Sequence, residues 1–287
     1  MPSTDRCDYR DPWLATKAFR RKRVMSTVFL AGLAVTCAGI AIQMWRTGDD
    51  TAHVVAKYVA VFGLTMLMVV LLGVCTDVEL IRRPGSVELR TFEGRAATIV
   101  PGSTAYFVAY QLIWVGFAVL FLMAAAETAL AAWRTHWPLA LLFACLGLGS
   151  ASAPMLALAG ALRRGRVVLT ADYIVHEGWS SRTRLPWDDV TRVSAAFEQS
   201  PMILIIGTDG QRWSHVVTTP RVPLGRGRRR VWMVDRPARR GSICVECPRI
   251  SVERRRLYEF LTYYTDHPAA RAELGTPLAL DRWHATR

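Results

Sequence analysis

Four long stretches of the chain are almost free of charge: residues 24–45, 58–76, 105–126 and 137–162. They run from 19 to 26 residues, and an α-helix needs about 20 mostly apolar residues to cross the hydrocarbon core of a bilayer. Core helices of water-soluble proteins are rarely this long without a charge. The pattern therefore predicts four membrane-spanning helices.

After residue 166 the pattern changes to short strand-like runs separated by turn signals. We predict strands at 167–170, 173–178, 182–186, 191–197, 202–207, 212–217 and 242–246, with 230–234 as a further candidate. The sequence Thr208-Asp209-Gly210, between two of these runs, is typical of a β-hairpin turn. The alternation thus predicts a mainly-β domain over residues 163–287.

One amphipathic helix is predicted over 251–266, with Ser251 as its N-cap and Pro268 ending it. Four apolar residues recur on one face at helical spacing, namely Leu257, Phe260, Leu261 and Tyr264. Strands closed by one helix favour a strongly bent sheet or barrel with the helix at one end.

The loop over residues 77–104 also contains two strand-like runs, which flank Glu93-Gly94. This pattern predicts a β-hairpin that packs on the C-terminal domain or lies along the lipid headgroups. The alternative is the shortened remnant of a duplicated module, since both β-regions follow a pair of spans.

The distribution of charge indicates how the helices are oriented. Lys and Arg number 36 against 23 Asp and Glu, a net charge of +13. Basic residues gather in residues 1–23, in the loop 77–104 and directly after the fourth span, whereas the other two loops hold only Arg46 and Arg134. We expect the membrane domain, residues 24–162, to lie in the inner (plasma) membrane. By the positive-inside rule, both termini are then expected on its cytoplasmic side.

The spans are informative about function classes. Buried charges usually mark an ion or proton path, and here only Lys57 comes close, at the outer edge of a span. A transporter is therefore disfavoured, and the outer loops are too short for a receptor domain. Small residues at spacing four in the last span (Gly149, Ala153, Ala157 and Ala161) predict close helix packing, either within the bundle or between copies in a homo-oligomer.

The basic segment over residues 221–240 is the main candidate site. It contains eight arginines and a single acidic residue, Asp235. The arginines are Arg221, Arg226, Arg228, Arg229, Arg230, Arg236, Arg239 and Arg240. Held near an anionic leaflet, each adds ~1 kcal/mol of attraction, with Trp232 and Met233 placed to reach the interface. A solvated loop is the plain alternative. Nucleic-acid binding competes weakly, because no base-reading element accompanies the arginines.

No combination of residues indicates catalysis, a cofactor or a metal. Cys244 and Cys247 form a single Cys-x-x-Cys without the second ligand pair that zinc needs. Asp188 and Asp189 fit a turn or helix start better than paired catalytic acids. We therefore expect a protein that is not an enzyme.

Three short segments of the C-terminal region are distinctive: Leu169-Thr170 with Asp172, Leu185-Pro186-Trp187-Asp188-Asp189, and Arg271-Ala272-Glu273-Leu274-Gly275. Through them, residues 163–280 resemble the bacterial pleckstrin-homology-like (PH-like) domain, in the version attached to actinobacterial integral membrane proteins. A glycine commonly follows the aspartate of the first turn, where this chain has Tyr173. The resemblance implies a seven-stranded barrel capped by a helix and used for docking, without implying phosphoinositide binding.

We expect a membrane-anchored docking or scaffold protein that presents a PH-like domain to an unknown protein partner. A sensor of anionic lipid acting through the arginines is the first alternative. A small transporter or accessory subunit of a membrane complex is the second.

Overall fold

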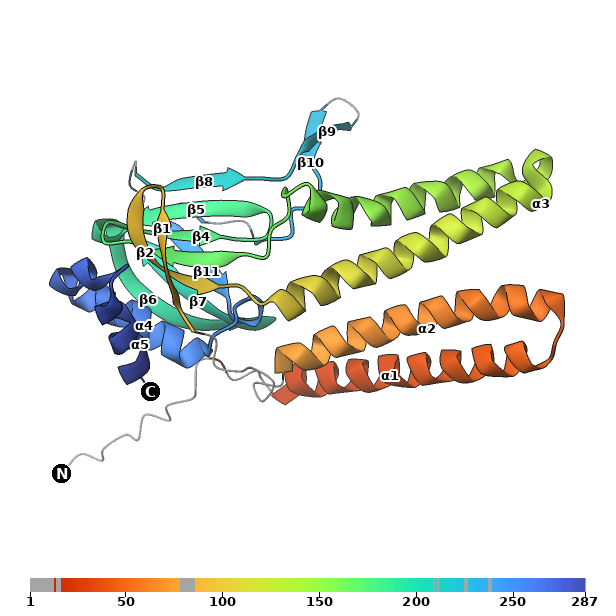
Figure 1. The fold of residues 1–287 in the computed structure, drawn as a ribbon, viewed down its shortest axis with the longest axis horizontal. Coiled ribbons are helices and arrows are strands. Elements are labelled where there is room, and N and C mark those ends of the chain that lie inside the picture. The colour runs from red at the N-terminus through yellow and green to blue at the C-terminus, as the bar shows by residue number, and fades with distance from the viewer. Residues whose placement is uncertain are drawn as a thin grey trace.

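The computed structural model describes residues 13, 17–77, 86–208, 210, 212–224, 227–236 and 239–286. Its helical part consists of α1 (Lys17–Arg46), α2 (Asp50–Asp77) and α3 (Thr104–Leu158). Helix α3 doubles back on itself (Figure 1), and the rings of Phe121 and Phe143 stack between its two halves. Four segments are long and apolar enough to span a membrane: Phe19–Arg46, Asp50–Val74, Thr104–Ala131 and His136–Leu158. The four predicted helices are confirmed, and they indicate a multi-pass membrane protein.

The regions predicted as outer loops are mostly helical. Helix α1 ends at Arg46 and α2 begins at Asp50, and α3 is helical through 127–136. As a result Glu127, which we expected in a loop, lies on α3, where it forms an ion pair with Lys57 and accepts a hydrogen bond from Tyr58. Lys57, at the outer edge of its span, is thus partnered by a carboxylate on the neighbouring helix.

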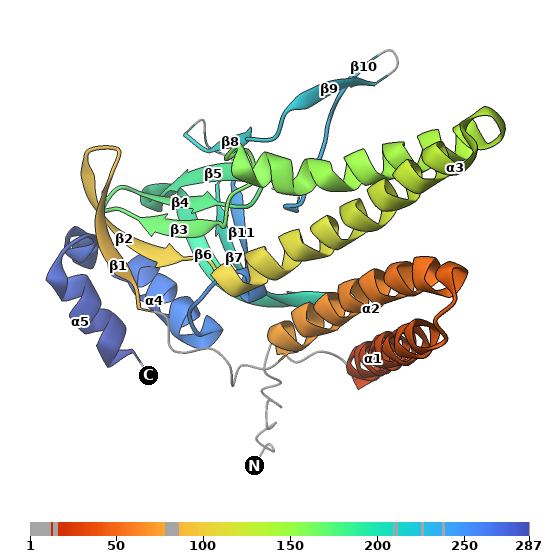
Figure 2. The same ribbon diagram turned by 45° about the vertical axis from the view of Figure 1, so that its right-hand side comes forward.

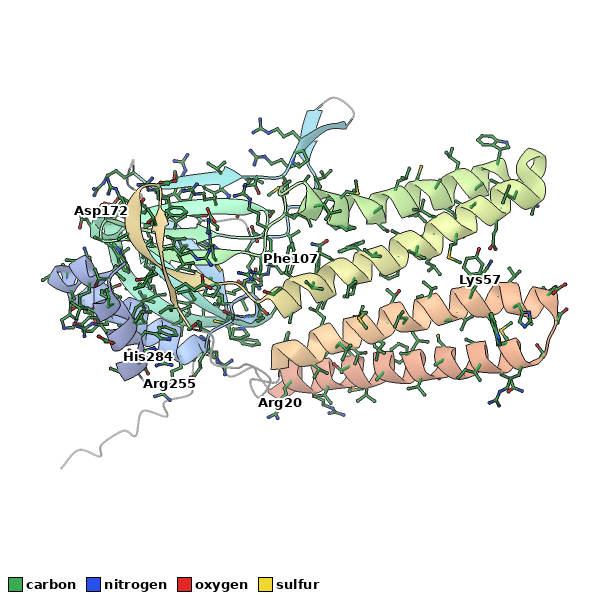
Figure 3. All side chains as sticks on the ribbon, in the orientation of Figure 1. Arg20, Lys57, Phe107, Asp172, Arg255 and His284 are labelled. Carbon is green, nitrogen blue, oxygen red and sulfur yellow. The ribbon has the colours of Figure 1, made fainter. Side chains whose placement is uncertain are left out.

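Both β-rich regions and the basic start of α1 lie at the same end of the helices. Figure 3 shows Arg20 next to the β-domain and Lys57 near the opposite end. This arrangement agrees with the clustering of basic segments on one side, and the assignment of that side to the cytoplasm stays a prediction.

The strands form two antiparallel sheets and a separate hairpin. The strands of the larger sheet are β1 (Glu88–Phe92), β2 (Arg95–Pro101), β3 (Arg166–Leu169), β4 (Tyr173–Glu177), β5 (Ser181–Pro186) and β8 (Ser214–Val217). They lie in the order β1-β2-β3-β4-β5-β8, and the order of the smaller sheet is β11-β7-β6. The smaller sheet contains β6 (Val190–Glu198), β7 (Ser200–Gly207) and β11 (Ser242–Glu246), and the hairpin contains β9 (Arg221–Leu224) and β10 (Gly227–Arg230). Among the described strands the two sheets are not closed into the expected barrel.

The loop between α2 and α3 completes the β-domain. Its hairpin β1–β2 pairs with β3, from Thr98 opposite Leu169 to Pro101 opposite Arg166, and Val87 and Val100 enter the main core. The tip of the hairpin curls over the outer face of β4 and β5 (Figures 1 and 2), where Glu93 forms ion pairs with Arg182 and Arg184. The β-domain is thus built from two separate parts of the chain.

The larger sheet is buried on both faces over β3 and β4. Val167, Leu169 and Ile174 face the main core, whereas Val168, Tyr173 and Val175 pack with Phe92, Ala97 and Ile99 of the curled hairpin. This explains why these strands read as continuous apolar runs: strict alternation is expected only where one face is solvated.

The main core lies between the two sheets and a helical layer. Ile203, Ile205, Ile243 and Val245 of the smaller sheet meet the larger one there, and α4 (Arg254–Asp266) closes it. The four residues predicted on the apolar face of this helix are all buried. The predicted cap is wrong, since Glu253 occupies the N-cap position and the Ser251 hydroxyl donates to the Pro101 carbonyl.

Two further expectations need correction. The domain ends in a second helix, α5 (Pro277–Ala285), which buries Trp283 against Phe260, so one helix does not close the fold alone.

The expected hairpin at Thr208-Asp209-Gly210 is also wrong, because β8 pairs with β5 and the strand before the turn pairs with β6 and β11. Alternation identifies a strand but not its partner, and here the chain crosses from one sheet to the other. Asp209 lies outside the described residues.

Candidate functional site

The first half of the basic segment is a β-hairpin. Strands β9 and β10 pair antiparallel, with Arg221 opposite Arg230 and Val222 opposite Arg229. Figure 1 shows this hairpin projecting from the β-domain at the level where the domain meets α3. We expected a loop up to a strand at 230–234; in the structure that strand is absent from the described residues, and pairing ends at Arg230.

The eight candidate arginines do not form one patch. Arg221 is exposed on β9, and Arg230 donates to the Val217 carbonyl of β8 at 3.0 Å. The backbones of Arg228 and Arg229 lie in β10, their side chains are outside the description, and so is all of Arg226. The remaining arginines follow the hairpin, and they are Arg236, Arg239 and Arg240.

These later arginines lie in two different places. Arg236 forms ion pairs with Glu198 and Glu246 close to the helices. Arg239 and Arg240 are exposed and precede the first residue of β11, at the opposite end of that strand from Glu246. Only the hairpin arginines therefore share one location.

The segment after the hairpin is anchored in the membrane helices. The ring of Trp232 meets that of Trp114 edge-to-face at 4.5 Å, and its Nε1 donates to Ser152 Oγ at 2.7 Å. Trp114 and Ser152 belong to the two halves of α3. The backbone of Trp232 has φ 57°, a left-handed conformation that costs a non-glycine residue energy. The neighbouring Met233 is 54% exposed.

A second anchor is the carboxylate of Asp235, the single acid in the basic segment. It accepts hydrogen bonds from the backbone N–H groups of Trp179 (3.0 Å) and Ser180 (2.7 Å) and from the hydroxyls of Ser180 and Ser181. Arg249 Nη1 completes the set at 2.8 Å. A Cβ on Gly178 would lie 2.3 Å from this carboxylate, so only glycine permits the approach.

The charge on Asp235 is stabilised despite its burial. Burial by itself acts to raise the pKa of the carboxyl, but the Arg249 guanidinium and the hydrogen bonds from Ser180 and Ser181 outweigh it, and the pKa is lowered. Asp235 is therefore ionised at neutral pH and holds the basic segment on the turn between β4 and β5.

The same turn packs on the start of α3. The Trp179 ring lies 5.6 Å from Tyr106, 5.2 Å from Phe107 and 5.0 Å from Tyr110, measured between ring centroids, and Phe107 marks this junction in Figure 3. The Arg249 guanidinium also lies over the indole, 4.6 Å from the ring centroid. The turn over residues 178–181 thus connects the β-domain, the basic segment and α3.

A small cavity lies behind this turn. Its volume is about 30 Å³, and its lining includes His176, Trp179, Asp235 and Arg249. Burial lowers the pKa of His176 to about 4, so its imidazole is neutral at pH 7. One buried donor, Trp179 Nε1, has no hydrogen-bond acceptor among the described residues, whereas Arg249 Nε lies 3.1 Å from Glu246 Oε2. The space is sufficient for one or two waters to serve as acceptors.

The described residues contain no group of three or more His, Cys, Asp or Glu placed to hold a metal ion. Cys247 is buried and Cys244 is half-buried, with its Sγ 3.7 Å from Met202 Sδ. Burial, together with the nearby Glu246, raises the pKa of Cys244 to about 11, which leaves a protonated thiol of low nucleophilicity.

Sequence reasoning identified the basic segment but not its anchors. Asp235 and Trp179 were missed because their partners lie far away in the chain: Asp235 is 14 residues from Arg249 and 56 residues from Trp179. The available signals were a single acid within a run of arginines and a Trp-Met pair next to it.

No family model, no curated protein and no solved structure matches the chain.

Proposed function

We propose that this chain is a non-enzymatic, membrane-anchored docking protein that presents its β-domain at the cytoplasmic face of the plasma membrane. The observation that carries the proposal is the attachment of the domain to the helices at several points. The hairpin β1–β2 enters the sheet from between two spans, and Trp179 and Trp232 both pack on α3. A domain joined at several points holds its outer surface at a fixed height and orientation, which suits an adaptor.

We propose the outer edge of β8 as the docking surface. Among the described strands this edge is unpaired, and its Val217 carbonyl accepts a hydrogen bond from Arg230. This strand ends the larger sheet, and Val216 on it is 59% exposed. An edge strand offers unpaired backbone groups to which an extended segment of another protein can add. The arginine hairpin follows β8 directly, so a partner segment that carries acidic residues fits best.

Photo-crosslinking in native membranes tests this proposal. A photoreactive residue in place of Val216 is expected to give one discrete heterologous adduct. The matched control is Leu278 on α5, which is 61% exposed and distant from β8. Labelling at Leu278 that equals labelling at Val216, or no discrete adduct at Val216, would overturn the proposed edge.

We further propose that the mainly-β domain is PH-like. Supporting this are the residue pattern quoted above, the two antiparallel sheets, and α4 closing the core between them. The open sheets and the added hairpin β1–β2 depart from the pattern that the resemblance implies. An experimental structure of the domain tests the assignment, and a strand order unlike that family's would reject it.

Anionic lipid contact by the arginine hairpin is the second candidate function. The observation that favours it is the position of Trp232, which fixes the end of β10 against the membrane helices. Hydrogen exchange over 221–230 is then expected to slow in nanodiscs of anionic lipid compared with neutral lipid, and high salt should abolish the difference. Equal exchange in both lipids would exclude this contact.

A further inference from the structure

The junction between the helices and the β-domain contains an open cleft. Its volume is about 400 Å³, within the range of small-molecule sites. Arg23 contributes from α1 and Tyr106 from the first turn of α3, whereas the β-domain contributes the turn at Gln199 and Ser200 and three charged side chains: Arg236, Glu246 and Arg249. The cleft therefore lies at the ends of the candidate spans, where the headgroups of one leaflet are expected.

The charge that lines this cleft is predominantly positive. Three arginines face one carboxylate, that of Glu246. Arg236 forms ion pairs with Glu198 and Glu246. Arg249 forms ion pairs with Asp235 and Glu246. The Glu198 side chain is 74% exposed, so its pair with Arg236 is weak, and an anionic ligand can replace it.

A further feature favours an anion. Helix α3 begins at Thr104, next to Tyr106 of the cleft, and a helix N-terminus carries partial positive charge. Arginines fixed by neighbouring groups present preorganised donors, the arrangement that suits phosphate oxygens.

We propose that this cleft binds the phosphate of a single anionic glycerophospholipid from the adjoining leaflet. The lipid tails would lie along α1 and α3, and the headgroup would lie between Arg23, Arg236 and Arg249. Basic pockets between membrane helices recognise headgroups in this manner. The proposal rests on the membrane attachment in the proposed function, and it differs from the hairpin contact because one lipid occupies one defined site.

Native mass spectrometry of the delipidated full-length chain tests the cleft. Titration with phosphatidylglycerol is expected to give one saturable adduct, whereas phosphatidylcholine and inorganic phosphate give weaker binding. Removing each charge should weaken the adduct about fivefold, so the double variant Arg23→Gln/Arg236→Gln should lose about 25-fold. Arg236→Lys keeps the charge and should recover most of the affinity.

Matched variants separate the possible outcomes. Arg255→Gln on α4, with a side chain that is 72% exposed, should leave the adduct unchanged. Arg221→Ser in the hairpin should also leave it unchanged, so failure of the hairpin contact or of docking at Val216 does not affect this readout. If the double variant were destabilised, Arg23→Gln alone must still show a fivefold loss. Equal binding of phosphatidylcholine, preferential binding of free phosphate, or indifference to Arg23→Gln would overturn the proposal.

Discussion

The substitution Asp235→Asn tests the anchor of the basic segment. The Asp235 side chain is 9% exposed and accepts hydrogen bonds from two backbone N–H groups, two hydroxyls and Arg249. Asparagine keeps the shape but places an NH₂ group among donors and removes the charge beside Arg249. Losing one member of a buried pair costs about 3–5 kcal/mol, and Glu246 still neutralises Arg249 in part, so we expect about 3 kcal/mol.

The readout is the apparent Tm of the β-domain in detergent, followed by its tryptophan fluorescence. A loss of this size corresponds to a decrease of about 10 °C for a domain of this length. The matched control is Asp172→Asn, because Asp172 is 62% exposed and its pair with Arg95 is a surface ion pair worth under about 1 kcal/mol. If Asp235→Asn melted within the error of Asp172→Asn, the carboxylate would not be an anchor.

Three further predictions concern the core and its assembly. Phe260→Ala should destabilise the domain by about 3–5 kcal/mol, since Phe260 is fully buried. The control Leu278→Ala should change stability by less than about 0.5 kcal/mol. Denaturant titration measures the free energy of unfolding of both variants. A fragment of residues 163–287 should be protease-sensitive because it lacks β1 and β2, and fusing 86–103 to its start should restore resistance; resistance of the unfused fragment would contradict this. His176 has a lowered folded pKa, so protons bind preferentially to the unfolded chain between about pH 6.5 and 4; Tm should fall across this range as the pH falls, and His176→Gln should flatten the profile.

The membrane helices could be predicted from sequence because their signal is local. A run of about 20 apolar residues is sufficient evidence for a span. In the structure three of the four runs are helical throughout, and the fourth is helical as far as Leu158. The same holds for β3, β4, β5 and β11, where apolar or alternating residues are bounded by turns. The apolar face of α4 was predictable for the same reason, since four residues at helical spacing define it.

The pairing of strands could not be predicted in the same way. Strand β8 lies opposite β5, about 30 residues earlier in the chain, because the turn after Gly207 crosses between sheets. Within that crossing, the backbone N–H of Gly207 donates a hydrogen bond to the Gly241 carbonyl, and that of Thr208 donates to the Asp189 carbonyl. These hydrogen bonds replace those of the expected hairpin. Strand β10 is Gly-Arg-Arg-Arg and β9 contains Pro223, so neither shows an apolar alternation and both resembled a loop.

The candidate site was partly predictable. The arginines and the Trp-Met pair identified the segment, but the contacts that place it come from the turn at 178–181 and from both halves of α3. These contacts depend on the tertiary fold, and the basic run contained no pattern that separated Arg221 on the hairpin from Arg236 in the cleft.

The rigid mounting of the β-domain on the helices is the central claim, and a distance measurement between them tests it most directly. Spin labels at Leu130, which is 88% exposed on α3, and at Leu278 on α5 would report it in nanodiscs, with the native cysteines replaced. We predict one narrow distance distribution, which Trp232→Ala should broaden. A broad or multi-peaked distribution in the unaltered domain would show that it moves independently of the helices, and would contradict the account.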